Sequence, residues 1–175
     1  TTKEQQYADR FLAQIWSMLD APSGRRGNGM AFFNSRGLLS AMKAIPYMDE
    51  AYKAKLRSYV VKYKESQAEI EKQNPYGVPF TAGGWGGTGG VVNWAITNYY
   101  AYKAFPDVMN KEYVLRGMDF IFGCHPYSNV SFVNAVGTRS KKVSYGNNRA
   151  DFTTIAGGIV PGLILLKPDF LENKD

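Results

Sequence analysis

Apolar residues recur at helical spacing along most of this chain, and this spacing limits the fold more than any other feature. Tyr7, Phe11, Ile15 and Met18 lie one helical turn apart and predict a helix over residues 3–19. Similar spacing predicts helices over residues 35–44, 49–73, 90–104, 111–122 and 155–166. Val130–Val136 is a candidate hairpin strand, but no run alternates well enough to form a main sheet. We therefore expect an all-α fold.

Residues that start and stop helices divide these segments. Asn110 is a suitable N-cap for the fifth helix, and Gly123 is placed to end it. Two long loops remain between the helices, one glycine-rich and aromatic over residues 75–87 and one over residues 124–148. Loops of this length inside a compact domain are usually functional or disordered. We expect an all-α domain with functional loops at one end.

The formal net charge of +6 raises the question of a nucleic-acid or membrane partner. The densest basic stretch is interrupted by Tyr52, Leu56, Tyr59, Val60 and Tyr63, a pattern typical of an amphipathic helix with a solvated basic face. No apolar run reaches the roughly 18 residues that a membrane helix needs. We expect no nucleic-acid partner and no membrane partner.

The chain has a single cysteine, Cys124, and a single histidine, His125. These counts exclude an internal disulfide, a cysteine-based zinc site and a His-pair metal site. Adjacent side chains rarely face each other as a catalytic Cys–His pair must, so we expect Cys124 to pack at a helix end. We predict neither a metal nor a cofactor.

The glycine-rich loop of residues 83–90 lacks the Lys-Ser/Thr ending of a phosphate-binding P-loop. Trp85 within it offers a flat apolar face on which a pyranose ring can stack, or it plugs the core beneath the loop. Residues 144–151 bring together a phenol, amides and a guanidinium, including Tyr145, Asn148 and Arg149. Such groups suit the hydroxyls of a carbohydrate, although a structural turn would use them too.

Glycoside hydrolysis usually needs two carboxyl groups that flank the bond. The sequence has 15 acidic residues, and most of them fall where a solvated helix surface is expected. Asp119 lies in an apolar helical segment, while Asp151 and Asp169 lie near glycine-rich or loop regions. No acidic pair stands out as catalytic.

Four blocks, taken in order, resemble the C-terminal half of family nine glycoside hydrolases, best known as endoglucanases. The most specific block contains Met118–Pro126, Ser131–Val133 and Gly137, which is similar to the family's Leu-Asp-Tyr, Leu-Gly-Arg-Asn-Pro and Ser-Phe/Tyr-Val…Gly pattern. The other blocks are Tyr76–Phe80 with Gly84–Gly87, the helix with Asn93 and Tyr102, and Asn147–Arg149 followed by the Gly157–Pro168 passage. The similarity covers roughly residues 75–170.

This resemblance implies that residues 1–175 are part of one (α/α)6 glycosidase catalytic domain, a partial six-hairpin toroid. It implies hydrolysis of β-glycosidic bonds of a glucan-type polysaccharide with inversion, by a secreted or periplasmic enzyme. Arg149 would hold substrate hydroxyls, and Trp85 and Tyr145 would stack or bond at flanking sugars. Asn148 and His125 complete the predicted substrate-binding set.

Three departures from the family pattern bear on these roles. Cys124 and His125 replace the Arg-Asn of the turn, and Asn147 and Asn148 replace two histidines. The family's Asp base and Glu acid fall outside this chain, so we expect no catalytic residue within it. A partial barrel should expose apolar surface, and we expect it to pack against the remainder of the same polypeptide or to self-associate.

Three other functions remain open from the sequence. The absence of both carboxylate motifs favours a non-catalytic carbohydrate-binding domain. A helical scaffold without a sugar site would bury Trp85 and pair Arg149 internally. A polysaccharide lyase on a related helical toroid would use a Tyr or His base such as Tyr145 or His125.

Overall fold

The computed structural model describes residues 5–21, 35–72, 74–79, 87–124, 128–142, 155–160, 165–166 and 171–172. The helices are α1 (Gln5–Asp20), α2 (Ser35–Ala44), α3 (Glu50–Glu71), α4 (Gly87–Ala104) and α5 (Glu112–Ile121), with the 3-10 helix η1 (Ile45–Tyr47). The short strands β1 (Leu165–Leu166) and β2 (Leu171–Glu172) pair antiparallel. The fold is mostly helical, which confirms the predicted all-α class.

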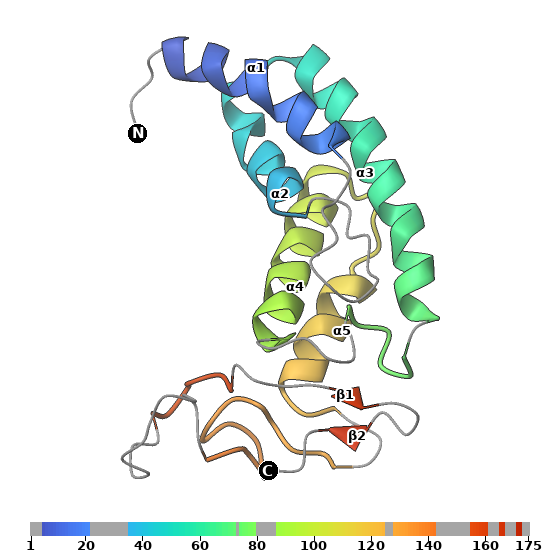
Figure 1. Cartoon of the computed structure of the whole chain (residues 1–175), viewed down its shortest axis with the longest axis vertical. Coiled ribbons are helices and arrows are strands. Elements are labelled where there is room, and N and C mark those ends of the chain that lie inside the picture. Colours follow the sequence, from blue (N-terminus) through green and yellow to red (C-terminus); the bar gives the residue numbers. More distant parts are fainter. Residues whose placement is uncertain are drawn as a thin grey trace.

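The helices form a bundle with the irregular segments gathered at one end. Helix α4 packs against both α5 and α2, and α2 also contacts α1 and α3. In Figure 1, α1 and α2 lie at the upper end, and α3 runs down one side of the bundle. The start of α4, the end of α5 and the segments that follow α5 lie at the opposite end.

Local capping signals set the helix ends. The Asp49 carboxylate accepts a hydrogen bond from Tyr52 N at 2.8 Å and caps α3. The Asn110 side chain accepts from Glu112 N at 2.9 Å, so it serves the start of α5 as the sequence predicts. Gly123 adopts a φ of +90° directly after α5, the left-handed conformation that a terminating glycine supplies.

Helix α3 confirms the amphipathic pattern read from the sequence. Tyr52, Leu56, Tyr59, Val60 and Tyr63 are all buried. The basic residues between them are exposed or half-buried (Lys53, Lys55, Arg57, Lys62 and Lys64). The ring of Trp16 from α1 lies against Tyr52 and Tyr59, with Lys55 over its outer face. The aromatic stripe therefore joins α1 to α3 while the charged face stays in water.

One buried hydrogen bond joins α4 to α3. Trp94 Nε1 donates to Gln67 Oε1 at 2.7 Å, and the Gln67 amide donates to the Tyr63 carbonyl at 3.0 Å. Gln67 is fully buried, and Trp94 is nearly so. Because an indole N–H buried without an acceptor is costly, this pairing fixes how α4 sits against α3.

The helix predicted over residues 155–166 is absent from the described part of that range, residues 155–160 and 165–166. Ile155–Val160 is a turn followed by an isolated bridge between Ile159 and Val133, and Leu165–Leu166 belongs to β1. Gly157 has a φ of +80°, which is incompatible with a right-handed helix. The backbone of this segment bonds instead to residues 132–134. The apolar run was therefore misinterpreted as helical.

The candidate strand at Val130–Val136 forms only isolated bridges. Ser131 pairs with Ser140 and Val133 with Ile159, outside any regular ladder. Helix α4 begins at Gly87 rather than near Gly90, so it includes glycines that the sequence placed in the loop. In the part of the chain that the structure describes, no helix is long and apolar enough to cross a membrane.

Candidate functional site

All five predicted substrate-binding residues lie outside the described residues. They are Trp85, His125, Tyr145, Asn148 and Arg149. The structure therefore does not test their roles. It does describe the chain on both sides of the segments that carry them, and these flanking residues can be placed.

The segment with Tyr145, Asn148 and Arg149 is flanked by chain that folds back on itself. Val160 N donates to Phe132 O and Asn134 N donates to Gly158 O, both at 2.9 Å. The Asn134 amide also donates to Ile155 O at 3.0 Å. Residues 155–160 are thus held against residues 132–134, which lie close before the segment in sequence.

The same place adjoins the end of α5. Phe132 N donates to Ile121 O at 2.9 Å, and the Phe132 ring lies 5.5 Å from that of Phe120. His125 follows directly after Cys124 at this point. The end of α5, its return through Phe132 and the segment of residues 155–160 therefore form one packed unit.

A groove lies beside this unit, between the outer face of α5 and the loop that follows α3. Its volume is about 350 Å³. It is lined by Pro75, Tyr76, Glu112, Leu115, Arg116, Asp119, Phe120 and Cys124. We call it the α5 groove. Pro75 and Tyr76, which form its other wall, belong to the loop that follows α3.

The loop wall of the groove is ordered by Asn74. Its amide donates to Val78 O at 2.7 Å, and its side-chain oxygen accepts from Tyr76 N at 3.0 Å. Gly77 has a φ of +60°, and a Cβ there would lie 2.8 Å from Arg116 Nη1. A glycine at this position therefore lets the loop lie directly against the arginine.

Arg116 joins α5 to the end of α3 at the groove. Its guanidinium donates to Glu71 Oε1 at 2.7 Å and to Glu112 Oε1 at 2.6 Å, and it lies over the Tyr113 ring at 5.6 Å. Its side chain is 25% exposed. Because charge-assisted bonds to two carboxylates occupy this cation, it is a poor candidate for binding a further anion.

The carboxylates of the groove do not form a glycosidase pair. Glu112 and Asp119 are two helical turns apart, about 10 Å along the axis. An inverting pair lies roughly 6.5–9.5 Å apart, and its acid needs an environment that keeps it protonated. The Glu112 side chain is 61% exposed and bonded to Arg116. Its exposure and its ion pair with Arg116 make Glu112 unsuited to the role of a protonated acid.

Cys124 is exposed, which contradicts the expectation that it packs at the helix end. Cys124 follows the turn at Gly123, and its backbone N donates to Asp119 O at 2.9 Å. Among the described residues, no cluster of three or more His, Cys, Asp or Glu side chains could hold a metal ion.

Sequence reasoning missed the α5 groove, although one signal was present. Glu112, Arg116 and Asp119 are spaced by four and three residues, which places them on one helix face. What the spacing could not show is the opposite wall, because Pro75 and Tyr76 come from a loop distant in sequence. The ion pair between Arg116 and Glu71 spans 45 residues.

No known protein family matches this chain. No curated protein sequence and no solved structure matches it either.

Proposed function

We propose that this chain is part of a carbohydrate hydrolase that cleaves β-glycosidic bonds of a glucan-type polysaccharide with inversion. The observation that carries the proposal is the position of the chain on either side of the three predicted substrate-binding segments. Residues 79 and 87 flank the segment with Trp85, residues 124 and 128 flank His125, and residues 142 and 155 flank the segment with Arg149. In Figure 1 the start of α4, the end of α5 and the segments after α5 lie at one end of the bundle.

Such convergence is what a sugar site built from separate loops requires. Arg149 and Asn148 supply donors for hydroxyls, Trp85 and Tyr145 supply faces for stacking, and His125 supplies a further polar contact. The packed unit of α5, Phe132 and residues 155–160 holds the described residues on both sides of His125 and of the segment with Arg149 against one another. Support of this kind holds binding groups in place at low entropic cost.

In this proposal the Asp base and the Glu acid lie outside residues 1–175. The helices described above would form part of an (α/α)6 toroid that also holds these two residues. The base would activate a water, and the acid would protonate the leaving oxygen. The carboxylates of the α5 groove do not replace them, since their spacing and exposure suit neither role.

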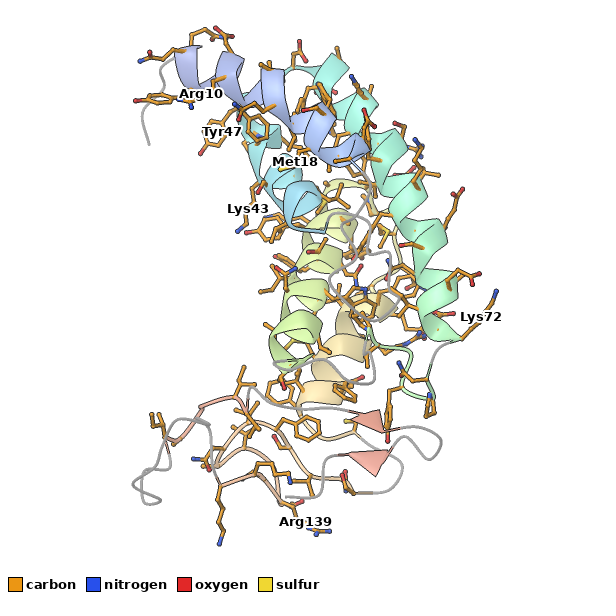
Figure 2. The ribbon with its side chains drawn as sticks, viewed as in Figure 1. Arg10, Met18, Lys43, Tyr47, Lys72 and Arg139 are labelled. Atoms are coloured by element: carbon orange, nitrogen blue, oxygen red, sulfur yellow. The ribbon has the colours of Figure 1, made fainter. Side chains whose placement is uncertain are left out.

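The test is release of reducing ends from β-glucans and hemicelluloses by a polypeptide that contains this chain together with the expected carboxylates. Replacing Arg149 by Ala should raise KM or lower kcat. Replacing Arg10 by Ala is the matched control, because Figure 2 places Arg10 on α1 at the other end of the molecule from Arg139. Equal kinetics of the R149A and parent enzymes would overturn the role of Arg149.

A non-catalytic carbohydrate-binding domain is the second candidate, favoured by the open groove whose carboxylates do not form a catalytic pair. This candidate predicts that oligosaccharides raise the melting temperature of a protein that releases no reducing ends. A helical scaffold predicts that no oligosaccharide changes the melting temperature.

A further inference from the structure

We propose that the outer surface of α4 and α5 binds a second copy of this chain, with the helices of the two copies antiparallel and Lys111 of each copy paired with the partner's Asp119. We call this surface the α4–α5 face. The inference goes beyond the proposed function, because it does not depend on whether the protein cleaves a sugar. It gives the expected self-association a surface and a geometry.

The two helices form one continuous surface. The start of α4 and the end of α5 lie at the same end of the bundle, so the two helices run antiparallel (Figure 1). A Cβ at Gly117 would lie 2.8 Å from Ala95 Cβ, so these two residues lie side by side. Both helices bury their inner sides in one common core, and their exposed sides therefore form one outer face.

The α4–α5 face is apolar. On α5, Leu115, Met118 and Phe122 are spaced by three and four residues, which places them on one side of the helix. On α4, Ile96 and Tyr99 are spaced by three residues. All five side chains are 36% to 48% exposed. Single exposed apolar residues are common, but a group of five on two adjacent helices is typical of an association surface.

The charges at the ends of this face indicate which partner covers it. Lys103 and Lys111 are exposed at the end where α4 stops and α5 begins, and Asp119 is exposed near the other end of α5. None of the three forms an ion pair with the residues that the structure describes. A face with an unpaired cation at one end and an unpaired carboxylate at the other is complementary to a copy of itself turned end for end.

The charges also select between the two possible twofold axes. An axis perpendicular to the helices, midway between Lys111 and Asp119, places each Lys111 opposite the partner's Asp119. An axis parallel to the helices would instead place Lys103 beside the partner's Lys111 and would leave Asp119 unpaired. Because like charges across an interface are unfavourable, the antiparallel arrangement is preferred.

The first test is oxidative cross-linking of residues 1–175 with Cys124 replaced by Ser. Ile96 lies at the level of Leu115 and therefore near the proposed axis, where a residue meets its own copy. Copper phenanthroline should therefore join two copies of the Ile96→Cys variant by a disulfide. Tyr47→Cys is the matched control and should not cross-link, since Tyr47 is exposed at the α1 and α2 end of the molecule (Figure 2).

The second test is charge reversal, measured by sedimentation equilibrium. Asp119→Lys and Lys111→Glu should each weaken dimerisation by at least about fivefold, because each turns two symmetric attractions into repulsions. The double variant K111E/D119K should restore dimerisation. Lys64→Glu, on the exposed side of α3, is the matched control and should leave it unchanged. Circular dichroism checks that every variant is folded.

Other outcomes would overturn the inference. A chain that stays monomeric at every concentration would show that the face binds no second copy. Dimerisation that neither D119K nor K111E weakens would rule out the antiparallel charge pairing. Cross-linking of I96C in residues 1–175 but not in a longer polypeptide would show that the remainder of that polypeptide covers the face instead. Since no test uses sugar cleavage, this inference and the proposed function can fail separately.

Discussion

Gly123 is the residue at which the chain turns after α5, next to the packed unit formed with Phe132 and residues 155–160. With a φ of +90°, a Cβ there would lie 2.5 Å from both Ser131 N and Val130 C. Gly123→Ala should therefore cost at least about 2 kcal/mol, from the strained backbone and the clash together. Urea unfolding measures this loss of stability.

Gly90→Ala is the matched control for this prediction. No heavy atom lies within 4 Å of the Cβ position at Gly90, near the start of α4. Alanine should change stability there by no more than about 1 kcal/mol and in the stabilising direction, because it favours a helix over glycine. A G123A protein as stable as the G90A protein would contradict the described turn.

Gln67 provides the buried acceptor that holds Trp94 against α3. Gln67→Leu keeps the approximate volume but leaves Trp94 Nε1 without its acceptor, so we expect a loss of about 1–3 kcal/mol. Gln14→Leu, on the exposed face of α1, should change stability by less than about 0.5 kcal/mol. Equal stability of the two variants in urea unfolding would show that the Trp94 bond contributes nothing.

The buried phenol of Tyr52 should make the free energy of unfolding depend on pH in the alkaline range. Burial raises the pKa of the Tyr52 phenol to about 12, and its hydroxyl donates to Ala41 O at 2.8 Å. Its contribution to stability is complete below pH 10, the pKa of an unfolded tyrosine, and is lost as the pH rises to about 12, because the unfolded state ionises first.

Urea unfolding between pH 9 and 12, in about half-unit steps, measures this effect. The parent protein should lose stability steeply from about pH 10 upward. Tyr52→Phe should be less stable at neutral pH, because Ala41 O loses its donor, and should show a shallower alkaline slope. Identical slopes for the two proteins would show that Tyr52 is not the residue responsible.

At the scale of a single element, the start of α3 depends on Asp49. Asp49→Ala removes the acceptor of the Tyr52 N bond and should destabilise the protein by about 1 kcal/mol. Asp49→Asn keeps an acceptor oxygen and should change stability by only a few tenths of a kcal/mol. Thermal unfolding of the three proteins ranks them, and the prediction fails if D49A matches D49N.

Helix ends that are set by nearby residues could be predicted from the sequence. The side chains of Asp49 and Asn110 accept hydrogen bonds from backbone N–H groups two or three residues away, and Gly123 adopts a positive φ that other residues rarely adopt, so each residue type marks a helix end in the sequence. The buried stripe of α3 was predictable for a similar reason. Apolar residues recur there about every 3.6 residues, which places them on one face of the helix, and this face is buried in the structure.

Elements set by distant partners could not be predicted in this way. Ile155–Val160 carries an apolar run like that of a helix, but its backbone bonds are made to residues 132–134, more than twenty positions earlier. The α5 groove depends in the same way on Pro75 and Tyr76 meeting α5. Periodicity within a short stretch of sequence contains no information on such contacts. The α5 face of the groove could therefore be predicted, but the opposite wall could not.

At the scale of the whole molecule, α4 exposes apolar side chains that a neighbouring helix would normally cover. It carries one charged residue, Lys103, in its 18 residues. Its inner face packs on α2 and α5, yet Ile96 and Tyr99 are 41% and 47% exposed on the outer side. Exposed apolar side chains on a helix with a single charged residue form a surface that is available for association.

We therefore expect the isolated chain to self-associate, as the sequence predicts for a partial barrel. Light scattering over a range of concentrations should give a mass above the 19.5 kDa of one chain.

Ile96→Lys should shift the equilibrium toward the monomer, because an ammonium group placed in an apolar contact loses its hydration. Tyr47→Lys is the matched control, since Tyr47 is 65% exposed at the α1 and α2 end of the molecule (Figure 2). A protein that stays monomeric at every concentration would contradict the partial-barrel proposal. Association that I96K leaves unchanged would place the contact elsewhere than on α4.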